Sequence, residues 1–223
     1  MIKWKNRNFS ELGIIVEKIP NISKAKKKIE VMQVAGRNGF ISIDTGAYEP
    51  FSVTLSCHCT TNANLDEIKA YLDGFGTLSF DGEREYTAIV DNAIPIETIL
   101  PIFKKFPVRF SVNPIAEDIT ATTENILNTS ELSITTYSTI YPTLTITCSG
   151  NISVTINNQT FYLSDTNGTY TLDCKNKIIK DSNGVNKSGL MTGDFPTFKN
   201  GTNTISKTGT IVAFTTTYKK TYL

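Results

Sequence analysis

The pattern of the first half is set by the stretch Ile29-Glu-Val-Met-Gln-Val-Ala-Gly-Arg-Asn-Gly-Phe-Ile-Ser-Ile43. Apolar and polar residues alternate from Ile29 to Val34, which predicts a strand. Residues 35–39 are typical of a turn, because the two glycines in this segment can adopt positive φ. Strand character resumes at residues 40–43, so the stretch predicts a strand, a turn and a second strand.

Further strands are expected on both sides of this stretch. Each is a short run rich in β-branched or aromatic residues, and the run at 51–57 alternates cleanly with period two. Asp81-Gly82 is expected as a turn between two of the strands. The expected strands are residues 13–16, 51–57, 77–80, 86–90 and 105–112.

One helix is expected among these strands. Asn62 or Asn64 can cap its start, and Gly74 is suited to its end. Residues three, six and seven positions after the first apolar residue share one face of a helix. That apolar face consists of Leu65, Ile68, Tyr71 and Leu72.

The character of the chain changes after Asn113-Pro114. Residues 116–139 are polar and Thr-rich, which is typical of a crossover or linker with short strands. Beyond them, short β segments alternate with turn residues, a rhythm that favours a β-sandwich. Those segments are 144–147, 152–156, 159–163, 170–173, 203–206 and 210–215. We therefore expect a mainly β protein with one prominent helix and two domains, residues 1–125 and 126–223.

Composition excludes several classes of protein. Of the 223 residues, 39% are hydrophobic and 19% are charged, and the formal net charge is +1. These values are those of an ordinary globular protein, and the near-neutral charge argues against binding nucleic acid through its phosphates. The sequence shows no apolar run near the ~20 residues that span a bilayer. The N-terminus lacks the apolar region of a secretory signal, so we expect a soluble protein made in a cytoplasm.

The sole histidine, His58, lies between Cys57 and Cys59 in a predicted strand. Strand alternation puts the two cysteines on one face and the histidine on the other. This arrangement lacks the Gly-x-Ser-x-Gly motif of a nucleophile elbow and the Cys-x-x-Cys spacing of a zinc site. We expect buried structural cysteines, no metal site and no cofactor.

Glycoside hydrolysis needs a pair of carboxylates on either side of the scissile bond. The candidate pairs are Glu83 with Glu85 and Glu117 with Asp118. The first pair lies in a turn-rich segment and the second near the linker, where solvated charges are the usual state. We expect no catalytic residue.

The order of motifs along the chain resembles that of siphophage distal tail proteins. Ala35 stands where the family usually has proline, and Tyr71-Leu72 stands where it often has Trp-Leu. Residues 142–146, 150–152, 193–196 and 201–206 are similar to the galectin-like C-terminal sandwich of the family. The motifs of the N-terminal ring domain are residues 9–14, 31–39, 46–48, 65–74, 76–80, 86–88 and 108–114.

The resemblance implies a non-enzymatic structural protein. In the family, N-terminal domains of commonly six copies close a ring between the major tail tube protein and the tail-tip hub. The C-terminal domains point outward, where some phages attach receptor-binding proteins. The implied location is the tail tip of the virion, after assembly in the host cytoplasm, with no nucleic-acid or membrane partner.

The resemblance also implies a contact surface in the first half. If it holds, the Gly36–Gly39 turn and its flanking strands form a hairpin near a ring interface, where strand edges pair instead of aggregating. The lysine run at residues 24–28 is a second candidate surface. The candidate interface residues are Lys26, Lys27, Val34, Gly36, Arg37, Asn38 and Gly39.

Two alternatives remain open. One is a carbohydrate-binding module of the tail tip, with Phe161, Tyr162 and Tyr170 as candidate aromatic contacts. Alternation sends Phe161 and Tyr162 to opposite faces, so we favour core packing for these side chains. The other alternative is a tail-tube or hub subunit, but the second β-rich half favours a distal tail protein.

Overall fold

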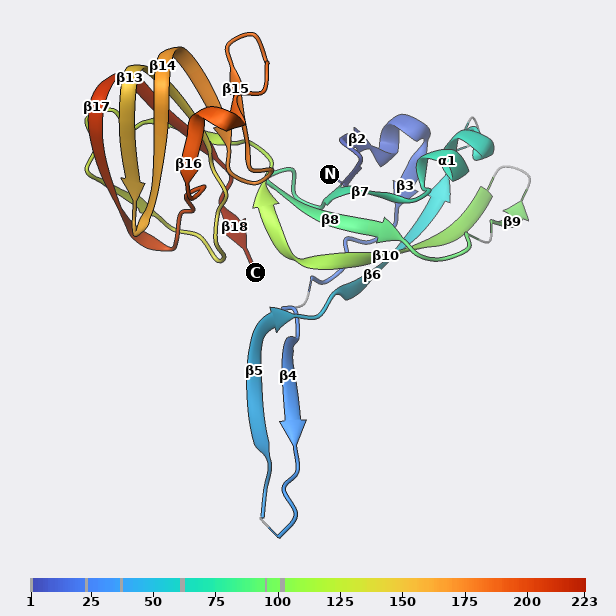
Figure 1. Cartoon of the computed structure of the whole chain (residues 1–223). Helices are drawn as coiled ribbons and strands as arrows, with labels where there is room; N and C mark the ends of the chain where they lie inside the picture. Colours follow the sequence, from blue (N-terminus) through green and yellow to red (C-terminus); the bar gives the residue numbers. More distant parts are fainter. Residues whose placement is uncertain (1, 23, 37, 61–62, 95, 101–102) are drawn as a thin grey trace. The chain divides into compact units, whose positions relative to one another are not determined.

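The computed structural model describes residues 2–22, 24–36, 38–60, 63–94, 96–100 and 103–223. The chain divides into two compact units, Met1–Ala116 with Leu223, and Glu117–Tyr222. The described residues are mainly β with one α-helix, as the sequence predicts (Figure 1). The sequence division at residue 125 leaves β11 (Thr122–Asn125) in the first half. The structure assigns this strand to the second unit, because it pairs with β17 (Gly201–Tyr218).

The first unit contains one large sheet, a separate two-stranded hairpin, one helix and a short 3-10 helix. Its elements are β1 (Lys3–Trp4), β2 (Arg7–Asn8), η1 (Phe9–Leu12), β3 (Ile14–Val16), β4 (Lys27–Met32), β5 (Ile41–Tyr48), β6 (Phe51–Cys59), α1 (Leu65–Tyr71), β7 (Phe75–Ser79), β8 (Arg84–Val90), β9 (Glu97–Leu100) and β10 (Phe103–Asp118). The large sheet has the order β2-β1-β7-β8-β10-β6-β3, with β9 pairing β10, while β4 and β5 form a separate two-stranded sheet.

Helix α1 forms where its capping and apolar residues predict it. The side chain of Asn64 accepts hydrogen bonds from the backbone N–H groups of Asp66 (3.1 Å) and Glu67 (3.4 Å), which satisfies the first turn. Ile68 and Leu72 of the predicted apolar face are buried against the sheet. The other candidate cap, residue 62, lies outside the described residues.

Trp4 is the centre of the first apolar core. Its ring is fully buried and meets Phe110 edge-on at 5.0 Å between centroids. The indole N–H donates to the Tyr71 carbonyl at 3.0 Å, so the polar end of the ring is also satisfied. The Tyr71 hydroxyl donates in turn to the carbonyl of Arg7 at 2.8 Å. These contacts fix the N-terminal strands against the helix and the sheet.

The second unit is built on a broad antiparallel sheet with its own apolar core. Besides β11 and β17 its elements are β12 (Glu131–Ile134), β13 (Thr143–Ile156), β14 (Gln159–Asp173), β15 (Ile178–Asp181), η2 (Ser188–Leu190), β16 (Met191–Gly193) and β18 (Thr221–Tyr222). The strand order is β11-β17-β13-β14-β15, while β12 pairs β17 and β16 pairs β14. Phe161, Phe198 and Phe214 are fully buried in this core.

Three strands of this unit are longer than the sequence predicts, so the expectation of many short strands is wrong. The breaks expected between segments 144–147 and 152–156, and between 203–206 and 210–215, lie inside β13 and β17, where the register shifts. Gly209 has φ +93°, and a Cβ there would lie 2.5 Å from the Asn151 carbonyl oxygen. A β-bulge uses the same positive φ as a tight turn, and therefore carries the same sequence signal.

Threonines line the face of this sheet that points away from the core. Thr147 pairs with Thr169 across β13 and β14, and their hydroxyl oxygens are 2.9 Å apart. Thr155 and Thr160 form the same kind of pair at 2.8 Å. Their β-branched side chains favour extended backbone, and each hydroxyl pair satisfies its own hydrogen bond. These positions are therefore polar without carrying charge.

Candidate functional site

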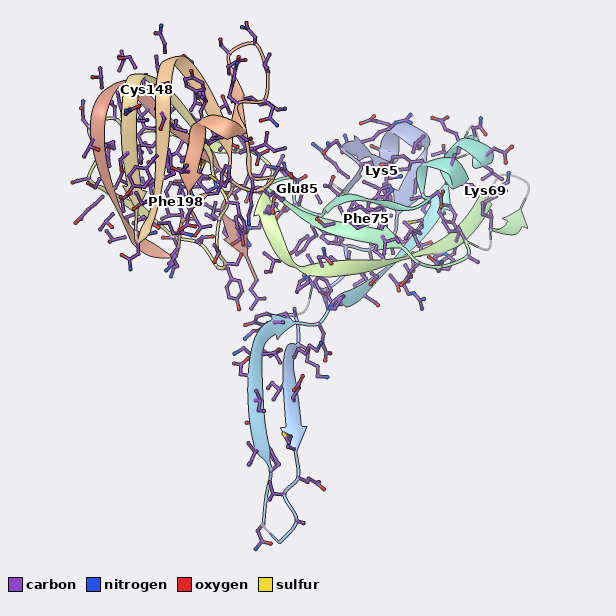
Figure 2. All side chains as sticks on the ribbon, in the orientation of Figure 1. Lys5, Lys69, Phe75, Glu85, Cys148 and Phe198 are labelled. Carbon is purple, nitrogen blue, oxygen red and sulfur yellow. The ribbon has the colours of Figure 1, made fainter. Side chains whose placement is uncertain are left out.

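The β4–β5 hairpin is the candidate site, because its apolar side chains are exposed. Among the described residues, no member of either strand belongs to the two apolar cores. Figure 2 shows side chains projecting from both sides of this ribbon. The apolar side chains of the hairpin and its tip that are 40–66% exposed are Ile29, Val31, Met32, Val34, Phe40, Ile41 and Ile43.

The register of the hairpin places apolar residues on both faces. Met32 is paired with Ile41, and Ile43 lies two residues further along the same strand, so these three share one face. Ile29 and Val31 lie on the opposite face. A two-stranded hairpin is marginally stable by itself in water, and exposed apolar patches mark contact surfaces. This geometry fits a segment that is completed by a partner on each side.

Ion pairs and turn-like hydrogen bonds hold the base of the hairpin. The Lys27 ammonium pairs with the Asp44 carboxylate, and Lys26 lies 3.2 Å from Glu49. The hydrogen bond from Lys27, together with the backbone N–H of Gly46, lowers the pKa of Asp44, and the same hydrogen bond raises the pKa of Lys27. All these charges are exposed, so they orient the strands more than they stabilise them.

The hairpin contains the candidate interface residues that the structure describes. Lys26 and Lys27 lie at its base, whereas Val34, Gly36, Asn38 and Gly39 lie in the tip between the two strands. Gly36 and Gly39 have φ of 79° and 91°, which confirms the predicted positive φ. Residue 37, the arginine of this set, lies outside the described residues.

Sequence analysis missed the apolar residues that dominate the hairpin surface. Ile29 and Val31 alternate with Glu30, and Ile41 and Ile43 alternate with Ser42, as they would in strands with one buried face. The pattern itself does not say whether a core covers that face. The signal that could have found them is that β4 has apolar residues at neighbouring positions, Val31 and Met32, which point to opposite faces. A strand with one solvated face needs apolar residues on one face only.

The surroundings of His58 do not form a nucleophile–base pair. Its ring lies on the sheet face opposite the core, with Nδ1 3.6 Å from a carboxylate oxygen of Glu17, which also binds Lys105 at 2.8 Å. The hydrogen bond from Lys105 lowers the pKa of Glu17. Cys57 and Cys59 are buried and free, as predicted, and burial raises the pKa of Cys57 to about 12. A thiol with that pKa is protonated and inert near neutral pH.

The candidate carboxylates serve in turns and at strand ends. Glu83 lies in the turn before β8, where its N–H donates to the Asp81 carboxylate at 2.9 Å, and Glu85 lies on β8. Glu117 and Asp118 end β10. Among the described residues, no group of three His, Cys, Asp or Glu side chains is placed to hold a metal ion. None of the helices in the described part of the chain has the length and apolar character to cross a membrane.

The aromatic candidates for a sugar platform are separated by the sheet. Phe161 is fully buried and Tyr170 is buried, so both pack in the core, as predicted. Core packing is wrong for Tyr162, which lies on the opposite face and is exposed, with Ser153 and Thr192 as its cross-strand neighbours. This arrangement leaves Tyr162 without Phe161 or Tyr170 as a stacking partner.

The fold of this chain is found in a solved phage protein. The crystal structure of SPP1 Dit (gp 19.1) protein, described as a paradigm of hub adsorption apparatus in Gram-positive infecting phages, superposes with a TM-score of 0.80. The match covers 100% of this chain and 98% of that protein at 10% sequence identity. No family model and no curated protein sequence matches the chain. The resemblance inferred from motif order is therefore confirmed at the level of the fold.

Proposed function

We propose that this chain is a non-enzymatic structural subunit at the tail tip of a long-tailed bacteriophage or prophage. The observation that carries the proposal is the fold shared with SPP1 Dit over both domains and nearly the full length of each chain. A likeness limited to one β-sandwich would fit many functions, because fold alone does not specify function. Two units matched in the same chain order support a common architectural role.

The proposed assembly is a homo-oligomeric ring, with six copies as in the family that the motifs resemble. The exposed hairpin supports this proposal, since each copy offers an apolar strand pair that lacks a core of its own. A hairpin that binds a different surface on the next copy makes a heterologous contact, and such contacts close into rings. The proposed interface residues are Lys26, Lys27, Val34, Gly36, Arg37, Asn38 and Gly39.

The ring would join the major tail tube protein to the tail-tip hub. In this arrangement the second unit offers a site for receptor-binding proteins, which would place the chain in the virion and in host attachment. The resemblance of motif order supports these partners. The near-neutral net charge is compatible with contacts made by shape and strand edges.

The mass of the purified protein in solution tests the ring. Light scattering over a concentration series should give a discrete species near six times 24.6 kDa, or a back-to-back pair of such rings. Electron microscopy of the same sample should show closed rings. A monomer at every concentration, which also stays monomeric when mixed with the tube and hub proteins, would overturn the proposal. If that monomer bound glycans on an array, a carbohydrate-binding module would be favoured instead.

A further inference from the structure

The chain contains four Asn-Gly pairs, and the structure places them in different environments. They are Asn38-Gly39, Asn167-Gly168, Asn183-Gly184 and Asn200-Gly201. We propose that Asn38, at the tip of the hairpin, is a site of spontaneous deamidation. We further propose that this modification limits how long an unassembled subunit stays able to assemble, a consequence that rests on the proposed function.

Deamidation uses the backbone that follows the asparagine. The backbone nitrogen of the next residue loses its proton and attacks the side-chain Cγ, the new N–Cγ bond closes a five-membered imide, and the amide nitrogen leaves as ammonia. Water then opens the imide at either carbonyl, which gives aspartate or isoaspartate. A glycine at the second position removes the Cβ that would obstruct the attack. The reaction needs only water and a backbone free to turn.

One Asn-Gly pair lies inside a β-ladder and a second lies at the end of one. Gly168 is paired with Cys148 between β14 and β13, and Gly201 is paired with Ile134 between β17 and β12. The side-chain oxygen of Asn200 also accepts a hydrogen bond from the backbone N–H of Thr136 at 3.1 Å. Ring closure at Asn167 requires the sheet to open locally, which is rare in core strands, and ring closure at Asn200 requires its hydrogen bond with Thr136 to break.

The third pair is restrained by a tight turn. The backbone N–H of Gly184, which would have to attack, donates to the Asp181 carbonyl at 2.9 Å. The N–H of Asn183 donates to the Asp181 carboxylate, also at 2.9 Å. The attacking nitrogen is therefore engaged and the asparagine backbone is fixed.

Asn38 lies in the tip of the hairpin, outside its paired strands. Both Asn38 and Gly39 are exposed. They lie in the loop that joins Met32 and Ile41, the last paired residues of the hairpin ladder. Gly39 has φ +91°. Tips of this kind open at almost no cost in free energy, so the imide geometry is frequently sampled.

The product changes the tip in two ways. A neutral amide becomes a carboxylate, and the isoaspartate form adds one methylene to the backbone of the turn. A new charge without a partner disfavours burial against another subunit. Subunits already in a ring would have the tip held in place, so the damage should accumulate in free protein.

Mass spectrometry of aged protein tests the chemistry. The protein is incubated at mildly alkaline pH in heavy-oxygen water, then cleaved after glutamate under mildly acidic conditions. Peptide Val31–Glu49 contains Asn38 as its only asparagine. We expect Asn38 to deamidate at least about tenfold faster than Asn167, Asn183 and Asn200. A roughly tenfold ratio corresponds to ~1.4 kcal/mol, the free energy needed to release the more restrained asparagines. Conversion of Asn183, Asn167 or Asn200 at the same rate or faster would overturn the assignment.

Assembly of aged protein tests the consequence. Wild type aged as monomer should lose ring formation in proportion to conversion at Asn38. Asn38→Gln closes an imide ring much more slowly, so ageing should cost it far less ring formation, with each protein measured against its own fresh sample. Fresh Asn38→Asp should assemble as poorly as aged wild type, with an unchanged unfolding midpoint. Equal loss in aged wild type and Asn38→Gln would refute the link to assembly. If fresh wild type forms no ring, the proposed function fails, while the mass measurement still decides the chemistry.

Discussion

Replacing Met32 and Ile41 together with serine should break the ring without unfolding the subunit. These residues face each other across β4 and β5, and their side chains are 56% and 40% exposed. Because the cores do not include them, the free energy of unfolding should change by no more than ~0.5 kcal/mol. The double variant Met32→Ser/Ile41→Ser therefore separates assembly from folding.

The expected loss can be worked out from the exposed fractions. Fully burying a Met or Ile side chain is worth ~1.5–3 kcal/mol, so burying the half of each that is still exposed gives ~1 kcal/mol per residue. Two residues give ~2 kcal/mol at each contact, which corresponds to a contact weakened by roughly 30-fold. Since every contact in a closed ring is affected, the concentration at which rings form should rise by at least that factor.

Sedimentation velocity over a concentration series measures this shift. The matched control is Val185→Ser/Val212→Ser, which removes two exposed apolar side chains from the second unit and should leave assembly unchanged. Circular dichroism during heating shows whether each variant is folded. Rings that form at the wild-type concentration in the hairpin variant would refute the role of the hairpin face. An equal loss in the control would refute its specificity.

Three further outcomes follow from local geometry. Gly209→Ala forces a Cβ into a positive-φ bulge against a carbonyl oxygen, and should lower the free energy of unfolding in urea by at least ~2 kcal/mol. Asn64→Ala removes the N-cap of α1 and should lower the free energy of unfolding in urea by ~0.5–2 kcal/mol. Asp44 has a lowered pKa in the folded hairpin. Its contribution to the stability of the hairpin is therefore present at neutral pH and is lost as pH falls through that folded pKa. Cross-strand nuclear Overhauser contacts of the hairpin should weaken in acid in wild type, and less so in Asp44→Asn.

Each of these outcomes has a matched control. Gly189→Ala adds a methyl group where the space is open and φ is not positive, and should be nearly neutral. Asn64→Ser keeps a side-chain oxygen at the cap and should recover most of the stability. A hairpin equally sensitive to acid with and without Asp44 would show that another group is responsible. A stable Gly209→Ala variant would show that the bulge relaxes without strain.

Local signals in the sequence predicted the helix and most strands of the first unit, because those signals act within one element. Asn64 caps the helix by hydrogen bonds to its own first turn, and Ile68 and Leu72 follow from helical periodicity. The lengths of β13 and β17 could not be predicted in the same way. Glycines such as Gly209 signal positive φ, but the neighbouring strand decides whether that backbone becomes a bulge or a turn.

The candidate site was predicted in part. The turn at Gly36 and Gly39 and the flanking strands follow from local chemistry, and the structure confirms the hairpin. The exposure of Met32 and Ile41 depends on the absence of a covering layer, which periodicity cannot report. The contact role of the hairpin residues stays a prediction until the solution mass is measured.

The threonine pairs on the outer face of the second unit bear on colloidal behaviour. A chain with a net charge of +1 has little electrostatic repulsion between its copies, so crowded subunits depend on other means to stay apart. Paired hydroxyls such as those of Thr147 and Thr169 carry no charge, and each pair already shares a hydrogen bond. Another sheet would therefore gain little free energy by packing against these positions. Nonspecific association through these positions is thereby disfavoured, which would leave the hairpin as the main contact surface in the proposed ring.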